Sequence, residues 1–115
     1  MYYLAITHYL ASNSYTLTNH QSQNTKQQLI EDALILSLSP VMQEAVDHYF
    51  GTTTQYWRPK LLHIGKDPAT IFTVHMQVET FVGPHNPPYH LVNLTLTNDV
   101  EGWKVRQMNV KKEMS

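Results

Sequence analysis

Apolar residues follow a helical period in one part of the chain and alternate with polar residues in the next. Between residues 25 and 50 they recur at steps of three and four, as in Leu29, Ala33 and Leu36, which is the pattern of an amphipathic helix. After Gly51 the period shortens to two, which is the pattern of a strand with one buried face. The chain therefore predicts helices followed by strands.

Local signals divide the helical region into two predicted helices. Thr25 and Gln28 have the spacing of a capping box, in which each side chain binds the other residue's backbone amide, so we expect the first helix to begin at Thr25. Ser39 followed by Pro40 is typical of an N-cap and a first helical position, so we expect a second helix to begin there. Gly51 then provides the left-handed residue that ends it.

Four runs of alternating residues predict an antiparallel sheet. Pro59 lacks a donor for the strand ladder, so its run is expected at a sheet edge or at a bulge. The apolar set of the last run changes parity near Arg106 and Gln107, which predicts a bulge there. The second run is expected to place Val82 on the same face as its other apolar residues. The predicted strands cover residues 56–64, 70–82, 89–98 and 103–110.

This order of elements predicts an α+β fold, because the helices are the only cover available for the apolar face of the sheet. We expect two N-terminal helices packed on a curved antiparallel meander of three to four strands, in a cystatin-like or NTF2-like arrangement. Residues 25–115 are predicted to form this single domain. Residues 1–24 are predicted to form an N-terminal arm.

The predicted arm differs from the rest of the chain in composition. Residues 1–25 contain no Asp, Glu, Lys or Arg and hold four of the seven tyrosines. Alternation around Leu4 and Ile6 favours a strand or a docked arm, and a frayed tail or the end of a truncated export signal are the alternatives. The segment lacks the basic region and the long apolar stretch of an intact signal peptide.

Composition excludes two classes of partner. A net charge of −1 gives no electrostatic footprint for nucleic acid, and no apolar run approaches the roughly 20 residues of a membrane helix. We therefore expect neither nucleic-acid binding nor a transmembrane segment. The absence of cysteine leaves the compartment open.

The segment Gly83-Pro-His-Asn-Pro-Pro-Tyr89 is the chain's most unusual loop. Its adjacent prolines restrict the backbone and remove two donors, so we expect a stiff connection that includes a cis bond at Pro87 or Pro88. The favoured interpretation is a structural turn, and the alternative is a ligand or partner site. The candidate site residues are His85, Asn86, Pro87, Pro88, Tyr89 and His90.

Histidine offers the main catalytic or metal alternative. Imidazole is the commonest metal ligand, and His75, His85 and His90, with Glu79, could in principle surround zinc. The chain holds no HExxH, CxxC or Gly-x-Ser-x-Gly motif. We therefore assign no catalytic residue, no metal ligand and no cofactor.

Three segments together resemble the bacterial domain-of-unknown-function family 3888. They are Thr80-Phe-Val-Gly-Pro-His-Asn-Pro-Pro-Tyr89, Ala33-Leu-Ile-Leu-Ser-Leu-Ser-Pro40 and His48-Tyr-Phe-Gly51, and the resemblance covers residues 29–111. The chain departs from the family pattern at Pro84 and His90. The resemblance implies a Gram-positive, often exported protein, hence an extracytoplasmic location, and it supplies no reaction.

Three functions remain open. The favoured one is a non-enzymatic binding module that presents the rigid proline loop to an unknown protein, peptide or small ligand. The second is a small NTF2-like enzyme with a pocket between helix and sheet, in which His90 is the acid–base candidate. The third is a metal-binding protein that uses His75, His85 and His90. The arm and the edge strand with Pro59 also allow a homodimer.

Overall fold

The computed structural model describes residues 19–113, and the side chains from residue 25 onward. Contacts within the chain separate two units, residues 1–33 and 34–115. The described part of the first unit is helical. The second unit holds the remainder of that helix and a four-stranded sheet. Residues 1–18 of the predicted arm, with its predicted strand, lie outside the described residues, and residues 19–24 are helical.

One helix, α2 (Asn19–Phe50), replaces the two that the sequence predicts. Pro40 lies inside it and is exposed. Leu38, Met42 and Val46 lie on either side of Pro40 at steps of four and are all 0% exposed. Burying each of these side chains contributes about 1.5–3 kcal/mol, which together outweighs the roughly 3 kcal/mol that a proline costs inside a helix. The prediction of a second helix start at Ser39 was therefore wrong.

The predicted capping box at Thr25 was also wrong. The helix already begins at Asn19, so Thr25 is an interior residue. The Gln28 side chain does not reach back toward it; its Nε2 donates to Asp32 Oδ1 at 2.9 Å, one turn further along. A capping-box pattern inside a longer helical sequence thus does not mark the start of the helix.

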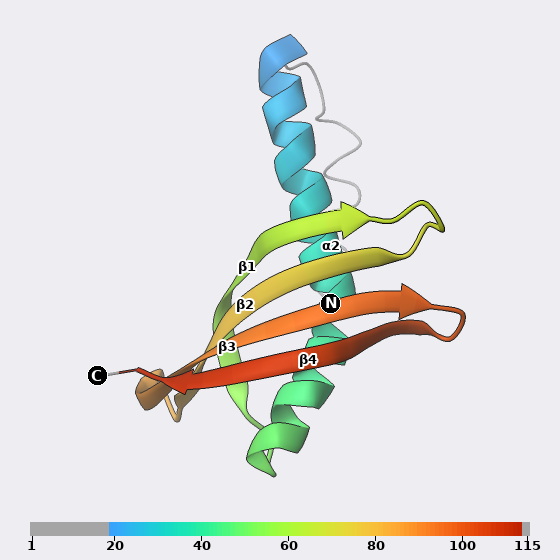
Figure 1. The fold of residues 1–115 in the computed structure, drawn as a ribbon. Coiled ribbons are helices and arrows are strands. Elements are labelled where there is room, and N and C mark those ends of the chain that lie inside the picture. The colour runs from blue at the N-terminus through green and yellow to red at the C-terminus, as the bar shows by residue number, and fades with distance from the viewer. Residues whose placement is uncertain (1–18, 114–115) are drawn as a thin grey trace. The chain divides into compact units, whose positions relative to one another are not determined.

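Four antiparallel strands follow α2 in sequential order, β1-β2-β3-β4. The α+β class and the meander are therefore confirmed. In the second unit, residues 34–50 of α2 cross one face of the sheet, and the strands curve in front of them (Figure 1). The strands are β1 (Gln55–Lys66), β2 (Phe72–Val82), β3 (Asn86–Asp99) and β4 (Gly102–Lys112).

The core lies between the helix and the sheet. Nine side chains form it, and none is more than 1% exposed. Three come from α2, and the other six come from the central strands β2 and β3, where they occupy alternate positions. The core residues are Leu38, Met42, Val46, Val74, Met76, Val78, Val92, Leu94 and Leu96. We call the face of the sheet that they occupy the covered face and the opposite face the open face.

Both predicted irregularities of the edge strands are confirmed. β1 is an edge strand whose register shifts between Trp57 and Lys60, around Pro59 and the positive φ of 54° at Arg58. In β4 the register shift leaves Arg106 as the extra residue. Trp103 and Val105 before the bulge therefore face the same side as Met108 and Val110 after it, despite the change of parity.

The end of β2 differs from the prediction. Val82 was expected on the covered face but is 53% exposed. A register shift between Thr80 and Val82 interrupts the pairing with β3. Thr80 is 2% exposed, and Phe81, whose ring lies 5.0 Å from that of Trp57, is 8% exposed. A bulge at a strand end interrupts the alternation, and no apolar pattern in the sequence marks it.

The predicted loop 83–89 is mostly strand. The turn contains only Gly83, Pro84 and His85, and β3 begins at Asn86. The peptide bond between Pro87 and Pro88 is cis, as predicted. The last pair that β3 forms with β4 is at His90, so the two prolines lie beyond the main ladder, where the missing donors leave no ladder position empty.

Candidate functional site

A cleft of about 370 Å³ opens beside the proline segment, at one corner of the second unit. Three parts of the chain that are distant in sequence form it: the end of α2 with the loop that follows, the end of β2, and the start of β3. The lining residues are Phe50, Thr52, Thr53, Thr54, Gln55, Thr80, Phe81, Val82, Gly83, Pro88 and His90. We refer to it as the corner cleft.

The lining combines apolar walls with hydroxyl groups. Phe50, Phe81, Val82 and Pro88 provide the apolar surface, and the loop threonines Thr52, Thr53 and Thr54 provide hydroxyls, of which Thr54 Oγ1 donates to the Thr52 carbonyl at 2.9 Å. His90 is the only titratable side chain of the lining, which includes no Asp, Glu, Lys or Arg. Its ring lies 5.2 Å from that of Phe50. Such a surface suits an uncharged group, because a charged one would lose hydration without finding a counter-charge.

The threonine loop is fixed to the helix rather than free. Gly51 ends α2 with a φ of 76°, and its amide donates to the Asp47 carbonyl at 2.8 Å. Asp47 Oδ1 accepts from the Thr54 amide at 2.8 Å and from Gln43 Nε2 at 2.8 Å. Gln43 Nε2 also donates to the Thr54 carbonyl at 2.7 Å. These hydrogen bonds hold this side of the cleft in place.

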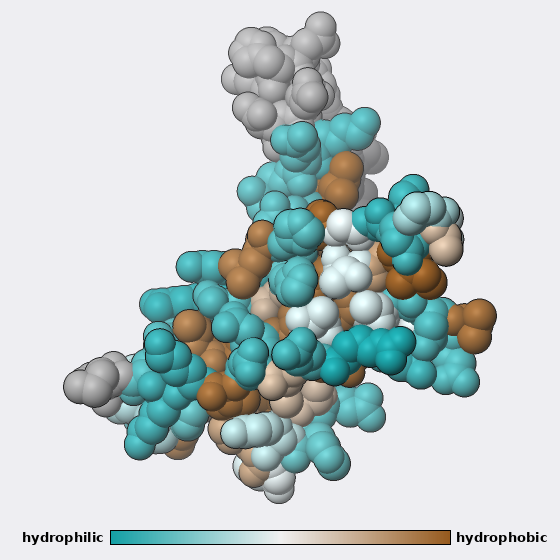
Figure 2. Space-filling model, in the orientation of Figure 1, coloured by the Kyte–Doolittle hydropathy of each residue, from teal (hydrophilic) through white to brown (hydrophobic). Residues whose placement is uncertain are grey.

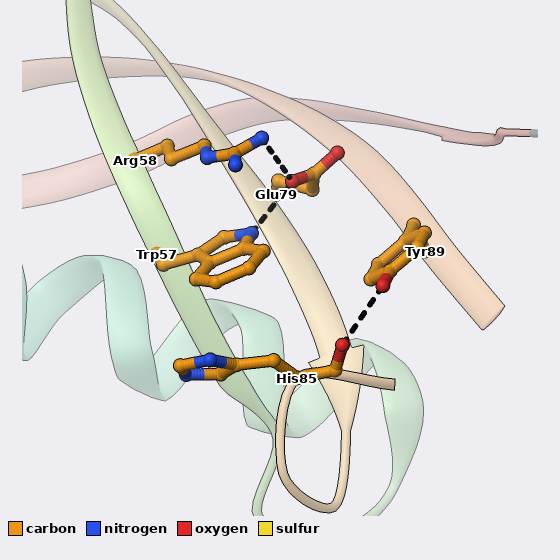
Figure 3. Close-up of polar contacts among 5 residues, drawn as sticks. All are labelled: Trp57, Arg58, Glu79, His85 and Tyr89. Carbon is orange, nitrogen blue, oxygen red and sulfur yellow. Dashed lines mark hydrogen bonds and ion pairs between the residues drawn. The ribbon is translucent and has the colours of Figure 1, made fainter. Parts of the chain in front are cut away.

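On the opposite side, the turn is held by aromatic contacts. His85 has a positive φ of 64°, and its ring lies 4.2 Å from that of Trp57 and 4.5 Å from that of Phe81. The Tyr89 hydroxyl donates to the His85 carbonyl at 2.8 Å, as Figure 3 shows. These contacts fix the turn that carries Gly83, which lines the cleft.

Trp57 is itself anchored on the open face. Its Nε1 donates to Glu79 Oε1 at 2.6 Å, and Arg58 forms an ion pair with the same oxygen at 3.4 Å (Figure 3). The Arg58 guanidinium lies 4.4 Å from the Trp57 ring centroid, within the range of a cation–π contact. The rigid turn is therefore connected through Trp57 to the middle of β2.

Glu79 forms a carboxyl pair with Glu113. The hydrogen bond from Glu113 is the main cause that lowers the pKa of Glu79, with smaller contributions from the Trp57 N–H and the Arg58 charge. The same hydrogen bond raises the pKa of Glu113, because that carboxyl retains its proton beside an ionised neighbour. Glu113 thus lies beside the residue that anchors Trp57, and its amide donates to the Tyr89 carbonyl at 2.9 Å.

The predicted site residues separate into three groups. Pro88 and His90 line the corner cleft. His85 and Tyr89 hold the turn without lining it. Asn86 and Pro87 are exposed and lie outside the lining.

Sequence reasoning missed most of the cleft, because its walls come from other elements. The residues that it did not propose are Phe50, Thr52, Thr53, Thr54, Gln55, Thr80, Phe81, Val82 and Gly83. The run of three threonines directly after the helix-ending Gly51 is the one signal that could have indicated a polar rim there.

The three histidines considered as metal ligands lie in different surroundings. His75 Nδ1 is 3.2 Å from Thr95 Oγ1 on the open face, His85 packs on Trp57, and His90 lines the corner cleft. Within residues 19–113, no three His, Asp or Glu side chains are arranged to hold a metal ion.

No helix in the described part of the chain combines the length and the apolar character needed to cross a membrane.

Comparison with known proteins identifies a family without an activity. A family model described as "Protein of unknown function (DUF3888)" matches residues 30–111, which confirms the predicted resemblance. No curated protein and no solved structure matches the chain. The matched region includes most of α2 and nearly all of the sheet.

Proposed function

Because the chain belongs to the DUF3888 family, whose description states no activity, we propose its function from the corner cleft: the protein is a non-enzymatic binding module that accepts an uncharged apolar side chain of a polypeptide partner. The partner's side chain enters between Phe50, Val82 and Pro88. The threonine hydroxyls along the rim then hydrogen-bond the partner's backbone.

The observation that carries this proposal is the exposure of Val82 inside a concave apolar wall. Val82 is 53% exposed, although the residue before it in the strand is buried, and it lines a cleft without Asp, Glu, Lys or Arg. Pockets of this kind, with apolar walls and a few polar groups, are typical of binding sites. Their preformed walls reduce the entropy lost on binding.

The lining favours binding over catalysis. An acid–base reaction needs a positioned proton carrier and a second group that acts on the substrate, whereas His90 is the single titratable residue around the cleft. The nine core side chains beneath the helix are at most 1% exposed, so a pocket between helix and sheet lies at the margin of the core, as the corner cleft does. We retain the cystatin-like or NTF2-like plan as a proposal for the fold, supported by a helix that crosses a curved meander.

A titration with a minimal probe tests the proposal. N-acetylphenylalaninamide, an uncharged aromatic residue with two peptide groups, is added to the ¹⁵N-labelled full chain and followed by amide chemical shifts. We expect saturable shifts confined to residues 52–55, 80–83 and 90. In Val82→Glu, the added carboxylate should abolish these shifts, because an apolar group cannot enter beside it.

Val100→Glu is the matched control. Val100 is fully exposed in the turn between β3 and β4, at the opposite end of β3 from Pro88 and His90 of the cleft, so the same change should leave the titration intact. Both substitutions should change the free energy of unfolding by about 0.5 kcal/mol or less. Shifts that are absent, scattered over the surface or equal in the two variants would refute the proposed function.

The predicted homodimer is tested separately. Light scattering of the full chain reports its mass in solution, and a monomer at working concentration would remove that prediction.

A further inference from the structure

A second surface, independent of the corner cleft, lies on the open face of the sheet. A shallow hollow of about 500 Å³ extends over all four strands there. Figure 2, drawn from this side, shows mainly hydrophilic and intermediate colours over the strands. The side chains that line it from this face are Leu62, His63, His75, Gln77, Asn93, Thr95, Gln107 and Asn109. We refer to it as the amide hollow.

The strand register arranges these side chains in two neighbouring rows. His63, His75, Thr95 and Gln107 are successive cross-strand partners and form one row. Gln77, Asn93 and Asn109 form the next row, which Lys60 continues at the edge, outside the hollow. Because strands lie about 4.8 Å apart, the four-residue row spans about 14 Å. The surface is therefore long enough for several units of a chain-like ligand.

The hydrogen-bonding groups of the amide hollow are only partly used within the protein. Gln77 Nε2 donates to Asn93 Oδ1 at 3.0 Å, and His75 Nδ1 lies 3.2 Å from Thr95 Oγ1. The side-chain amides of Gln107 and Asn109 have no partner among residues 19–113. Each side-chain amide offers both donors and an acceptor, so the hollow presents many groups that can either donate or accept a hydrogen bond.

The absence of charge in this lining selects among ligand classes. No Asp, Glu, Lys or Arg lines the hollow, whereas phosphates and carboxylates are recognised by Arg and Lys. An added peptide strand would pair with a sheet edge and not with a face. Hydroxyl groups both donate and accept, as these amides, imidazoles and the Thr95 hydroxyl do, which makes a neutral polyhydroxyl chain the complementary ligand.

Leu62 supplies an apolar margin. The second register shift of β1, between Leu61 and His63, displaces Leu62 from the ladder, and its side chain is 52% exposed. A sugar ring has an apolar face of C–H groups and a rim of hydroxyls, so it can contact Leu62 or the imidazole of His63 while its hydroxyls reach the amides. We propose that the amide hollow binds a neutral, linear oligosaccharide.

The test uses the ¹⁵N side-chain amide signals as direct reporters. The full chain is titrated with two neutral hexasaccharides, one of β-1,4-linked glucose and one of β-1,4-linked N-acetylglucosamine, to several millimolar. We expect saturable shifts of the side-chain amides of Gln77, Asn93, Gln107 and Asn109 with at least one of them. The proposal is overturned if neither sugar moves these signals, or if the sugars move only the residues of the corner cleft.

A double substitution, Gln107→Ala with Asn109→Ala, removes the two amides without a partner. Both residues are exposed, so the fold should persist, and the dispersion of the backbone signals verifies it. The dissociation constant should rise about tenfold or more, since each lost hydrogen bond accounts for roughly a three- to tenfold change. Gln28→Ala, which removes an exposed amide from the helix, should leave the affinity unchanged. Equal affinity in the double variant would contradict the proposal.

N-acetylphenylalaninamide distinguishes this site from the corner cleft. It should leave the signals of the amide hollow unmoved. If it moves them and the sugars do not, the open face binds polypeptide and the oligosaccharide proposal fails. Loss of binding at the cleft alone would refute the proposed function and leave this site standing.

Discussion

The covered and open faces of the sheet are built from alternate residues of the same strands, yet they differ in almost every property. On the covered face, Val74, Met76 and Val78 are 0% exposed and pack beneath the helix. On the open face, the intervening His75 and Gln77 bind neighbouring side chains and remain accessible. The comparison teaches that one strand can carry two separate sets of constraints, packing on one side and surface chemistry on the other.

The largest effect should come from the covered face. Met42→Ala leaves a cavity between α2 and the sheet, because Met42 is 0% exposed in the core, and should lower the free energy of unfolding by about 2–5 kcal/mol. Asn109→Ala, on the open face, should change it by about 0.5 kcal/mol or less. Urea unfolding of both variants measures the difference, and similar losses would show that the two faces are not distinct in this way.

The second effect concerns Trp57, which is anchored on the open face by Glu79. Trp57→Phe removes the N–H that binds Glu79 at 2.6 Å and should cost about 1–2 kcal/mol of stability. It should also broaden the backbone signals of the turn 83–85, since His85 packs on the Trp57 ring. Arg58→Ala removes a side chain that is 65% exposed and should cost less than half as much. A larger loss of stability in Arg58→Ala than in Trp57→Phe would mean that the ion pair, and not the Trp57 hydrogen bond, anchors this part of the sheet.

A smaller, pH-dependent effect on stability is expected at Tyr56, which connects β1 to the helix. The Tyr56 hydroxyl lies 2.8 Å from Ser39 Oγ, and burial raises the pKa of Tyr56 above its usual 10.0. The folded state therefore holds this proton more tightly than the unfolded state does. The resulting stabilisation is present below pH 10 and is lost as the pH rises through the folded pKa.

Tyr56→Phe should accordingly cost about 1 kcal/mol near neutral pH, and this difference from the parent should narrow above pH 10. Thermal unfolding of both proteins across the alkaline range measures it. A difference that stays constant with pH would mean that Tyr56 ionises equally in the folded and unfolded states.

The smallest effect is expected at the carboxyl pair. The raised pKa of Glu113 means that its protonated form is favoured on folding, so its contribution is present below pH 4.5 and lost as the pH rises through the raised pKa. Glu113→Gln keeps a donor toward Glu79 at every pH. The variant should be slightly more stable than the parent at pH 7, and the gap should close in acid. Glu44→Gln, on the exposed side of the helix, serves as the control, and identical pH profiles for all three proteins would contradict the pairing.

The sheet was predictable because strand patterns repeat. Alternation placed Val92, Leu94 and Leu96 on one face, and the change of parity near Arg106 indicated the bulge. The helix was misjudged at Pro40, since local signals for a helix start were outweighed by long-range burial on either side of it. Local propensity is a weak guide wherever tertiary packing contributes more free energy.

The corner cleft was predictable only in part. Pro88 and His90 were proposed from the unusual loop, but Val82 was assigned to the core because the bulge after Thr80 leaves no trace in the pattern. Phe50 and the threonine loop join the site through folding of the helix end against β2, a contact between distant segments that no single sequence window contains. The amide hollow was missed because its rows run across strands and not along them.

The binding site at the corner cleft is tested most directly by mapping which residues an apolar probe contacts. An isotope-filtered NOE experiment on the labelled chain with N-acetylphenylalaninamide should show contacts from the probe's ring protons to the methyl groups of Val82 and Thr53, in the corner cleft. Leu62, with an exposure of 52%, and Val100, which is fully exposed, are about as accessible as Val82, with 53%, or more so, and they act as internal controls. Contacts to these two residues alone, or to all four sites equally, would contradict a built binding site at the corner.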